Sequence, residues 1–170
     1  MQPDHVGHGT RHEAWRDERL SRRTGRRSGV QLRSVVVPDY HYLLPNLAQG
    51  SAPPSVPGMP FDVIVLAAME YQPDIPGYVV LKVPLDDGPP PDHVTRMRIR
   101  HAAREIADRV RLGQRVLVTC WQGRNRSGVL AGLALVDLGV HPIQAVGRIR
   151  RLRNGLTNAY FRAMVNSGRI

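Results

Sequence analysis

The stretch VLVTCWQGRNRSGVLAG, residues 116–132, places a cysteine between a strand and a helix. The residues VLVT have the pattern of a buried strand, and the apolar run after Ser127 has that of a buried helix. A short loop with one glycine and several polar residues joins them. Backbone N–H groups in such a loop can converge on one point, where the positive end of the helix dipole also lies. The stretch therefore predicts an anion-binding nest with Cys120 at its base.

The rest of the chain alternates between strand and helix patterns. Short apolar runs that predict buried strands occupy 34–37, 62–67, 78–83 and 115–119. Helical patterns cover 92–112, 127–138, a segment that begins near Pro142, and 157–165. This alternation predicts an α/β fold with a mostly parallel central sheet flanked by helices.

The helix at 92–112 has clear boundary signals. Asp92 follows a proline and can cap its start, and Gly113 can end it. Its expected buried face contains Val94, Met97, Ala102, Ile106 and Val110. The helix at 127–138 is apolar nearly all round, so we expect it to run through the centre of the fold, with Gly139 at its end.

Length and charge indicate one domain with a basic arm. The 170 residues suit a single core, which we expect at 34–170. Residues 1–33 contain eight arginines and four acids without an apolar period, which predicts a disordered arm. The formal charge of +10 favours anionic partners, so RNA and acidic lipid are candidate partners of a basic surface of the protein. Three histidines of the arm share a rough helical face, namely His5, His8 and His12. A metal site would need an ordered scaffold, which a disordered arm does not offer.

Cys120 is the single cysteine, which excludes an intramolecular disulfide and fits a reducing compartment. An apolar run of about 18 residues is absent from the sequence, and no apolar stretch follows the basic start. We therefore expect a cytoplasmic protein without a transmembrane segment, and we expect neither a metal nor another cofactor.

The spacing from Cys120 to Arg126 suits phosphate chemistry. A nest of N–H groups and a helix N-terminus favour the thiolate form of a cysteine, which is the nucleophilic form. With five residues between them, the loop closes so that the Arg126 guanidinium can return and grip two phosphoryl oxygens. The intervening residues would surround the bound phosphate: Trp121, Gln122, Gly123, Arg124 and Asn125.

This loop resembles that of the protein tyrosine phosphatase superfamily, and within it the compact dual-specificity phosphatases, whose phosphate loop reads C-x5-R-[ST]. The resemblance covers roughly residues 34–167 and includes HYLLPNLAQGS at 41–51 and the closing helices at 145–165. It implies a three-layer fold in which Cys120 attacks phosphorus and forms a cysteinyl-phosphate that water cleaves. It also implies that the Ser127 hydroxyl stabilises the departing thiolate.

The resemblance also implies a general acid upstream of the cysteine. The segment VPLDD, residues 83–87, fits the family's strand-then-Asp pattern and assigns the acid to Asp87, with Asp86 as the alternative. A positioned acid contributes roughly 10²–10⁴ in rate. One departure concerns Thr119, because the family usually has His before the cysteine.

The sequence leaves the substrate open. A phosphorylated protein is the expected substrate, with phosphotyrosine first. The segment GRNRSG around Asn125 also resembles the loop of cysteine-type RNA triphosphatases, and a phosphoinositide phosphatase or a non-catalytic phosphate-binding pseudophosphatase are further alternatives. A nucleotide-binding phosphate loop is excluded because Gly128 is followed by Val and Leu instead of Lys and Ser or Thr.

Overall fold

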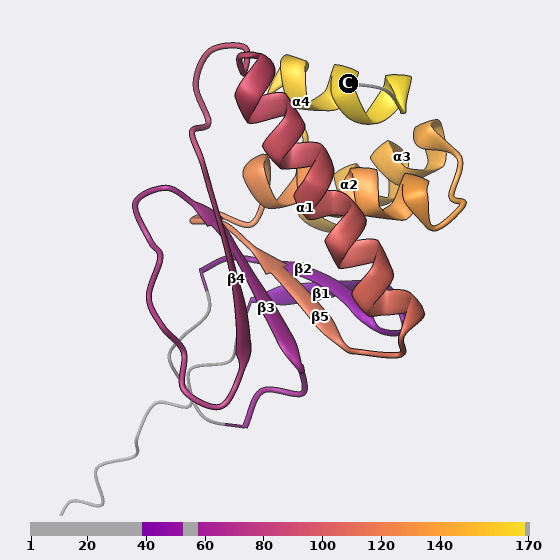
Figure 1. Ribbon diagram of the computed structural model, residues 1–170. Helices are drawn as coiled ribbons and strands as arrows, with labels where there is room; N and C mark the ends of the chain where they lie inside the picture. The colour runs from indigo at the N-terminus through magenta and orange to yellow at the C-terminus, as the bar shows by residue number, and fades with distance from the viewer. Residues whose placement is uncertain (1–38, 53–57, 169–170) are drawn as a thin grey trace, which may run out of the picture. The chain divides into compact units, whose positions relative to one another are not determined.

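The computed structural model describes residues 39–52 and 58–168, which belong to the second of the chain's two units, Val36–Ile170. The arm predicted at 1–33 and the strand predicted at 34–37 lie outside these residues. The elements, drawn in Figure 1, are β1 Tyr40–Leu44, β2 Leu47–Gly50, β3 Val63–Ala68, β4 Val79–Leu85, α1 His93–Arg111, β5 Val116–Thr119, α2 Arg126–Asp137, α3 Pro142–Arg153 and α4 Ala159–Ser167.

The five strands form one sheet in the order β1-β2-β5-β3-β4. β1 pairs with β2 in the antiparallel sense, and the other neighbours are parallel, which confirms the mostly parallel sheet. β5 is the central strand, so the loop that follows it starts from the middle of the sheet. Ligands of parallel sheets bind beyond the carboxyl ends of the strands, and this loop lies at that edge.

Different kinds of structure pack against the two faces of the sheet. Val63 and Val65 of β3 belong to the large apolar cluster that also contains buried residues of all four helices. Ile64 and Leu66 point to the other face, where the cluster contains strand residues and residues of non-helical segments such as Phe61. This period of two follows from the pleat of a strand. The sheet is therefore flanked by helices on one face and by non-helical chain on the other.

Helix α1 begins and ends near the predicted residues. The Asp92 carboxylate accepts a hydrogen bond from the Thr95 N–H at 2.7 Å, as an N-cap does. The predicted face was wrong at its first turn, because Val94 and Met97 are exposed. Buried α1 residues start one turn later and comprise Ile99, Ala102, Ala103, Ile106, Ala107 and Val110. Val94 and Met97 lie on the side of α1 opposite to these residues, whereas Thr95 and Arg96, on the same side as the buried residues, are half-buried.

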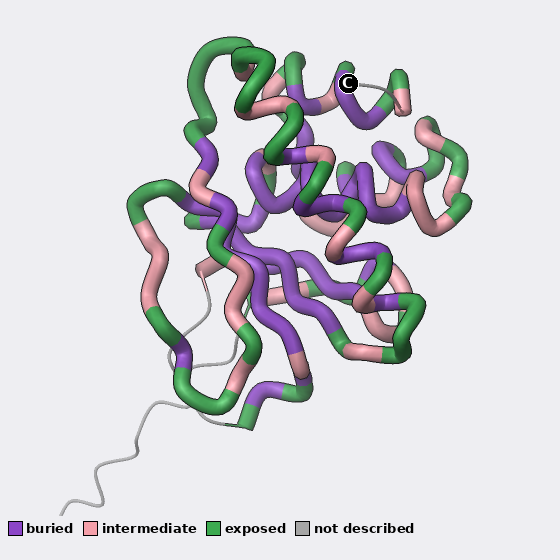
Figure 2. The backbone as a smooth tube through the Cα atoms, in the orientation of Figure 1, coloured by how far each residue is buried: buried purple, intermediate pink, exposed green. Residues whose placement is uncertain are grey.

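Helix α2 runs through the helical layer as predicted. Its first ten residues, Arg126 to Leu135, are all buried, which explains why the sequence there is apolar on every side. Figure 2 shows it as a continuous buried segment behind α1. Gly132 permits the close approach of α4, because a Cβ there would lie 2.8 Å from a methyl carbon of Val165. Helices α2 and α4 are therefore in close contact at Gly132.

Candidate active site

Cys120 lies where the central strand β5 ends. Its N–H donates a hydrogen bond to the Gly50 carbonyl at 3.3 Å, which ties the start of the loop to β2. Seven residues later the Ser127 side chain lies in the first turn of α2. The segment Cys120–Arg126 is called the phosphate loop below. The strand, loop and helix predicted at 116–132 are thus present, and they meet at the sheet edge (Figure 1).

The carbonyl groups of the phosphate loop are bound on its outer side. The buried Gln49 amide donates to the carbonyls of Gly123 and Arg124 at 3.2 and 3.4 Å. Arg153 donates to the Gly123 carbonyl at 3.2 Å and to the Gln122 carbonyl at 3.4 Å. Because these carbonyls face outward, they do not present negative ends to an anion inside the loop.

Four backbone donors of the phosphate loop have no hydrogen-bond partner among the described residues. They are the N–H groups of Trp121, Gln122, Arg124 and Asn125. Backbone donors rarely stay unpaired, and successive N–H groups in a loop form the kind of nest that holds an anion. The loop therefore has the hydrogen-bonding capacity predicted from its sequence.

Gly123 is required at its position in this loop. Its φ of +63° lies in the left-handed region, which side chains disfavour. A Cβ there would also lie 2.4 Å from the Gly50 carbonyl carbon and from an Arg153 nitrogen. The phosphate loop is thus packed directly against the end of β2.

Cys120 is 3% exposed, and its sulfur lies 3.2 Å from the Ser127 hydroxyl oxygen. A hydroxyl at this distance can donate a hydrogen bond to a thiolate, which is the contact that the resemblance implied. Thr119, which stands where the family usually has His, donates its hydroxyl to the Val65 carbonyl at 3.1 Å. Its polar group is thus bound within the sheet.

Arg126 forms a two-pronged ion pair that the sequence did not predict. Its terminal nitrogens donate to the two carboxylate oxygens of Glu70 at 2.5 and 2.7 Å. The Arg126 Nε is buried and has no partner among the described residues. Chiefly the hydrogen bonds that Arg126 donates to Glu70, and less strongly its proximity to Cys120 and Asp87, raise the pKa of Arg126 above its usual value. Arg126 therefore lies among Cys120, Glu70 and Asp87 and keeps a free donor.

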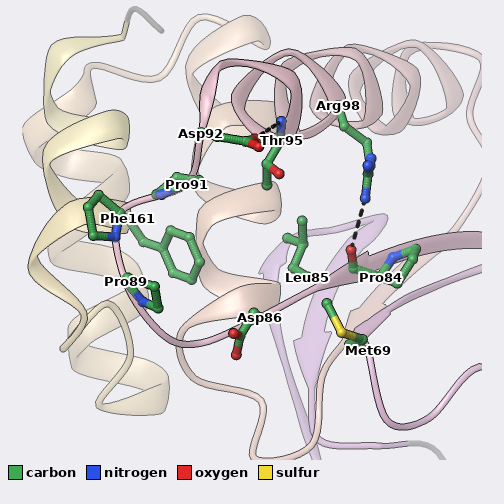
Figure 3. Close-up of a pocket in the computed structure, with 11 residues that line it drawn as sticks. Met69, Pro84, Leu85, Asp86, Pro89, Pro91, Asp92, Thr95, Arg98 and Phe161 are labelled. Carbon is green, nitrogen blue, oxygen red and sulfur yellow. Dashed lines mark hydrogen bonds between the residues drawn. The ribbon is translucent and has the colours of Figure 1, made fainter.

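The two candidate acids lie differently. Asp87 accepts hydrogen bonds from the side-chain amides of Asn125 at 3.1 Å and Asn158 at 3.3 Å, so its carboxylate lies against the phosphate loop. Asp86 instead lines a hollow of about 270 Å³ between the segment that follows β4, α1 and α4. Figure 3 shows Asp86 at the edge of this hollow, with Leu85 and Phe161 in its wall. This placement favours Asp87 as the group that reaches a bound phosphate.

The rim of the phosphate loop has an aromatic and a cationic side chain. Trp121 is 56% exposed and contacts the Tyr71 ring edge to face, with a centroid distance of 6.3 Å. The Arg124 side chain is exposed and makes no ion pair or hydrogen bond within the described residues. Both side chains are available to whatever approaches Cys120.

Sequence reasoning missed four residues that organise this site. Gln49 had a weak signal, since it is a polar residue within an apolar strand. Glu70 follows a buried strand at the sheet edge where the cysteine also lies. Arg153 is the last residue of α3, and Asn158 precedes α4 as its N-cap. Neither had a signal from spacing, because long-range contacts bring Arg153 to Gly123 and Asn158 to Asp87.

The described residues contain no group of three or more His, Cys, Asp or Glu side chains placed to hold a metal ion. Among those same residues, none of the helices is both long and apolar enough for a membrane span.

No protein-family model matches the chain, and no curated protein matches it. Solved structures do match. Human DUSP28 is 23% identical, with a TM-score of 0.67 over 78% of this chain and 94% of that one. Tk-PTP in its active form is 22% identical, with a TM-score of 0.64 over 77% and 96%. OH1 from the Orf virus, a tyrosine phosphatase, is 20% identical, with a TM-score of 0.57 over 77% and 87%.

These likenesses establish the fold. The described domain has the architecture of the dual-specificity phosphatases in the protein tyrosine phosphatase superfamily, as the sequence predicted. The coverage exceeds three quarters of this chain and most of each of these structures.

Proposed function

We propose that this protein is a cysteine-dependent phosphomonoester hydrolase with Cys120 as its nucleophile. The observation that carries the proposal is a set of unpaired donors around one sulfur. Four loop N–H groups and the Arg126 Nε lack partners among the described residues, and they belong to the loop that starts at Cys120. A phosphoryl group is a tetrahedral anion that would satisfy donors arranged in this way.

In the first step the Cys120 thiolate attacks phosphorus while the bond from phosphorus to the leaving oxygen breaks. Asp87 gives its proton to that oxygen, so an alcohol or phenol departs and a cysteinyl-phosphate remains. Arg126 and the loop N–H groups hold the three equatorial oxygens, where charge spreads in the transition state. Glu70 keeps the guanidinium in place through its two hydrogen bonds.

In the second step water attacks the phosphorus of the cysteinyl-phosphate. Asp87, now a carboxylate, takes one proton from the water as the sulfur–phosphorus bond breaks and inorganic phosphate forms. The Ser127 hydroxyl, 3.2 Å from the sulfur, donates to the returning thiolate. This contact lowers the cost of releasing a charged sulfur from phosphorus.

Phosphotyrosine in proteins is the substrate that we favour. The exposed Trp121 ring and the Tyr71 ring beside it would contact an aromatic leaving group. OH1 from the Orf virus, a structural neighbour, is a tyrosine phosphatase with triple substrate specificity, so the proposal is not restricted to phosphotyrosine. Arg124, which has no partner in the part of the chain that the structure describes, favours substrates with a second anionic group near the phosphate, including RNA 5′-phosphates and phosphoinositides.

Hydrolysis of p-nitrophenyl phosphate in the presence of a chelator tests the proposal. We expect turnover that needs no metal and that Cys120→Ser abolishes. A side-by-side panel of phosphopeptides, triphosphate-ended RNA and phosphoinositides then ranks the substrates. Equal release of phosphate by the wild type and Cys120→Ser would contradict the proposal, and binding of phosphopeptide without turnover would identify a pseudophosphatase.

A further inference from the structure

The carboxylate of Asp87 is held by two side-chain amides from different parts of the chain. Asn125, in the phosphate loop, donates from Nδ2 to Oδ2 of Asp87 at 3.1 Å. Asn158, at the start of α4, donates from Nδ2 to Oδ1 of Asp87 at 3.3 Å and to the Gly88 carbonyl at 3.4 Å. Segments that are 38 and 71 residues from Asp87 thus converge on one carboxylate.

The side-chain oxygen of each amide fixes the orientation of its NH₂ group. Oδ1 of Asn125 accepts hydrogen bonds from the N–H groups of Thr157 at 2.8 Å and Asn158 at 3.1 Å. Oδ1 of Asn158 caps α4 by accepting from the N–H groups of Tyr160 and Phe161 at 3.0 and 3.3 Å. Because each oxygen is bound by backbone donors, each Nδ2 group must face Asp87.

The chain around Asp87 has little else to hold it. From Asp86 to Pro90 these residues are exposed. Within the described residues, the hydrogen bonds of this segment are those from Asn125 and Asn158. Its prolines have no N–H to donate, so they cannot add backbone hydrogen bonds. Two amides therefore decide where the Asp87 carboxylate lies.

We propose that Asn125 and Asn158 are positioning residues that hold the general acid Asp87 over the phosphate loop before substrate binds. The inference rests on the proposed function for its chemical role, while the clamp itself is a property of the fold. A protonated Asp87 remains compatible with the clamp, because one oxygen carries the proton for the leaving group and the other still accepts from an amide. A leaving oxygen is thus met by an acid that is already in place.

The variant Asn158→Asp isolates the clamp from the cap. Asp caps helices as well as Asn does, so the acceptor for Tyr160 and Phe161 is kept. Its second oxygen replaces the N–H donor and faces Asp87, which turns an attraction into a repulsion between carboxylates. Asn166→Asp, an exposed change later in the same helix, adds the same charge away from Asp87 and is the matched control.

Leaving-group dependence reads out acid catalysis. Expulsion of an acidic phenol, as from difluoromethylumbelliferyl phosphate, needs little help from an acid, whereas release of phenol from phenyl phosphate needs much. For Asn158→Asp we expect kcat on phenyl phosphate to fall about 10–100-fold, part of the roughly 10²–10⁴ that a positioned acid contributes. On difluoromethylumbelliferyl phosphate we expect kcat to fall less than about threefold. KM should stay unchanged on both esters because Arg126 is intact.

Hydrogen–deuterium exchange tests the clamp without relying on activity. Peptides that cover residues 85–96 should exchange faster in Asn158→Asp than in the wild type or Asn166→Asp, while α4 peptides should be unchanged. Equal kinetic losses on both esters, or no loss, would overturn the positioning role. Unchanged exchange at 85–96 would overturn the clamp itself. A wild type inactive on every ester would refute the proposed function, and the exchange result would still decide the clamp.

Discussion

Glu70 and Arg126, 56 positions apart, face each other through two parallel hydrogen bonds at the rim of the phosphate loop. The Arg126 side chain is 10% exposed and that of Glu70 is 47% exposed, so the pair extends from the core to the surface. Bidentate pairing fixes the plane of the guanidinium, and it leaves the Nε edge for an anion on the other side. The carboxylate thus orients Arg126 without occupying all of its donors.

Replacement of Glu70 by Gln should weaken phosphate binding. An amide offers one oxygen to the guanidinium and places an N–H against the other nitrogen, so the orientation of Arg126 is lost. We expect kcat/KM to fall about 10–100-fold, in line with the loss of a partner that orients an active-site group. Steady-state kinetics with p-nitrophenyl phosphate measure this effect.

Stability provides the control for that variant. Glu70→Gln should lower the free energy of unfolding by about 1–2 kcal/mol, because the half-exposed pair is worth more than a surface pair and less than a buried one. Asp74→Asn removes an exposed carboxylate that pairs with Lys82, and should cost less than about 0.5 kcal/mol. Equal activity in Glu70→Gln and Asp74→Asn would contradict the orienting role.

Acid should destabilise the fold through the same pair. Hydrogen bonds from Arg126 hold the pKa of Glu70 below 4.5. A lowered folded-state pKa means that the ionised carboxylate contributes stability above the unfolded value and loses it as pH falls through the folded value. The difference in unfolding free energy between the wild type and Glu70→Gln should therefore shrink below pH 4.5. Urea unfolding at several pH values measures it, and a constant difference would exclude this linkage.

Gln49 should contribute to the stability of the phosphate loop. Gln49→Met keeps the size of the side chain but removes the donor for the Gly123 and Arg124 carbonyls. Leaving a buried acceptor unpaired costs about 1–3 kcal/mol, and we expect a loss in this range by urea unfolding. Gln144→Met, an exposed change on α3, should stay within about 0.5 kcal/mol of the wild type. If both variants behave alike, Gln49 does not support the loop.

Ser127→Ala should slow the second step more than the first. The hydroxyl lies 3.2 Å from the Cys120 sulfur, where it can stabilise the thiolate that leaves phosphorus. Removing a single donor to a developing anion typically costs about 10²–10³ in rate. Rapid mixing should reveal a burst of phenol followed by slow phosphate release. A uniform decrease without a burst would indicate a different role for Ser127.

The sequence predicted the elements that local pattern determines. β5, α2 and the phosphate loop were found because strand and helix periods and the spacing from Cys120 to Arg126 are local properties. The buried α2 was equally visible as an apolar run. The segment 41–51 was matched only through the resemblance, and its division into β1 and β2 was not predicted, because their antiparallel pairing depends on the short turn at Pro45 and Asn46.

The site residues that the sequence did not predict reach the site through contacts between distant parts of the chain. Glu70 and Arg153 carry charges that look like ordinary surface residues until the fold brings them to Arg126 and Gly123. Asn125 was expected to surround phosphate, yet its side chain turns outward to Asp87 and to the segment before α4. The prediction for Val94 and Met97 was wrong for a local reason, because 3.6 residues per turn place them on the side of α1 opposite to Ile106.

The most direct test of the account is to trap the intermediate on Cys120. The wild type and the variant Asp87→Asn, mixed with p-nitrophenyl phosphate and quenched in acid within milliseconds, should each show a peptide containing Cys120 that carries one added phosphoryl group. Cys120→Ser should show none. Turnover without any phosphorylated Cys120 peptide, or phosphate found on another residue, would contradict the central claim.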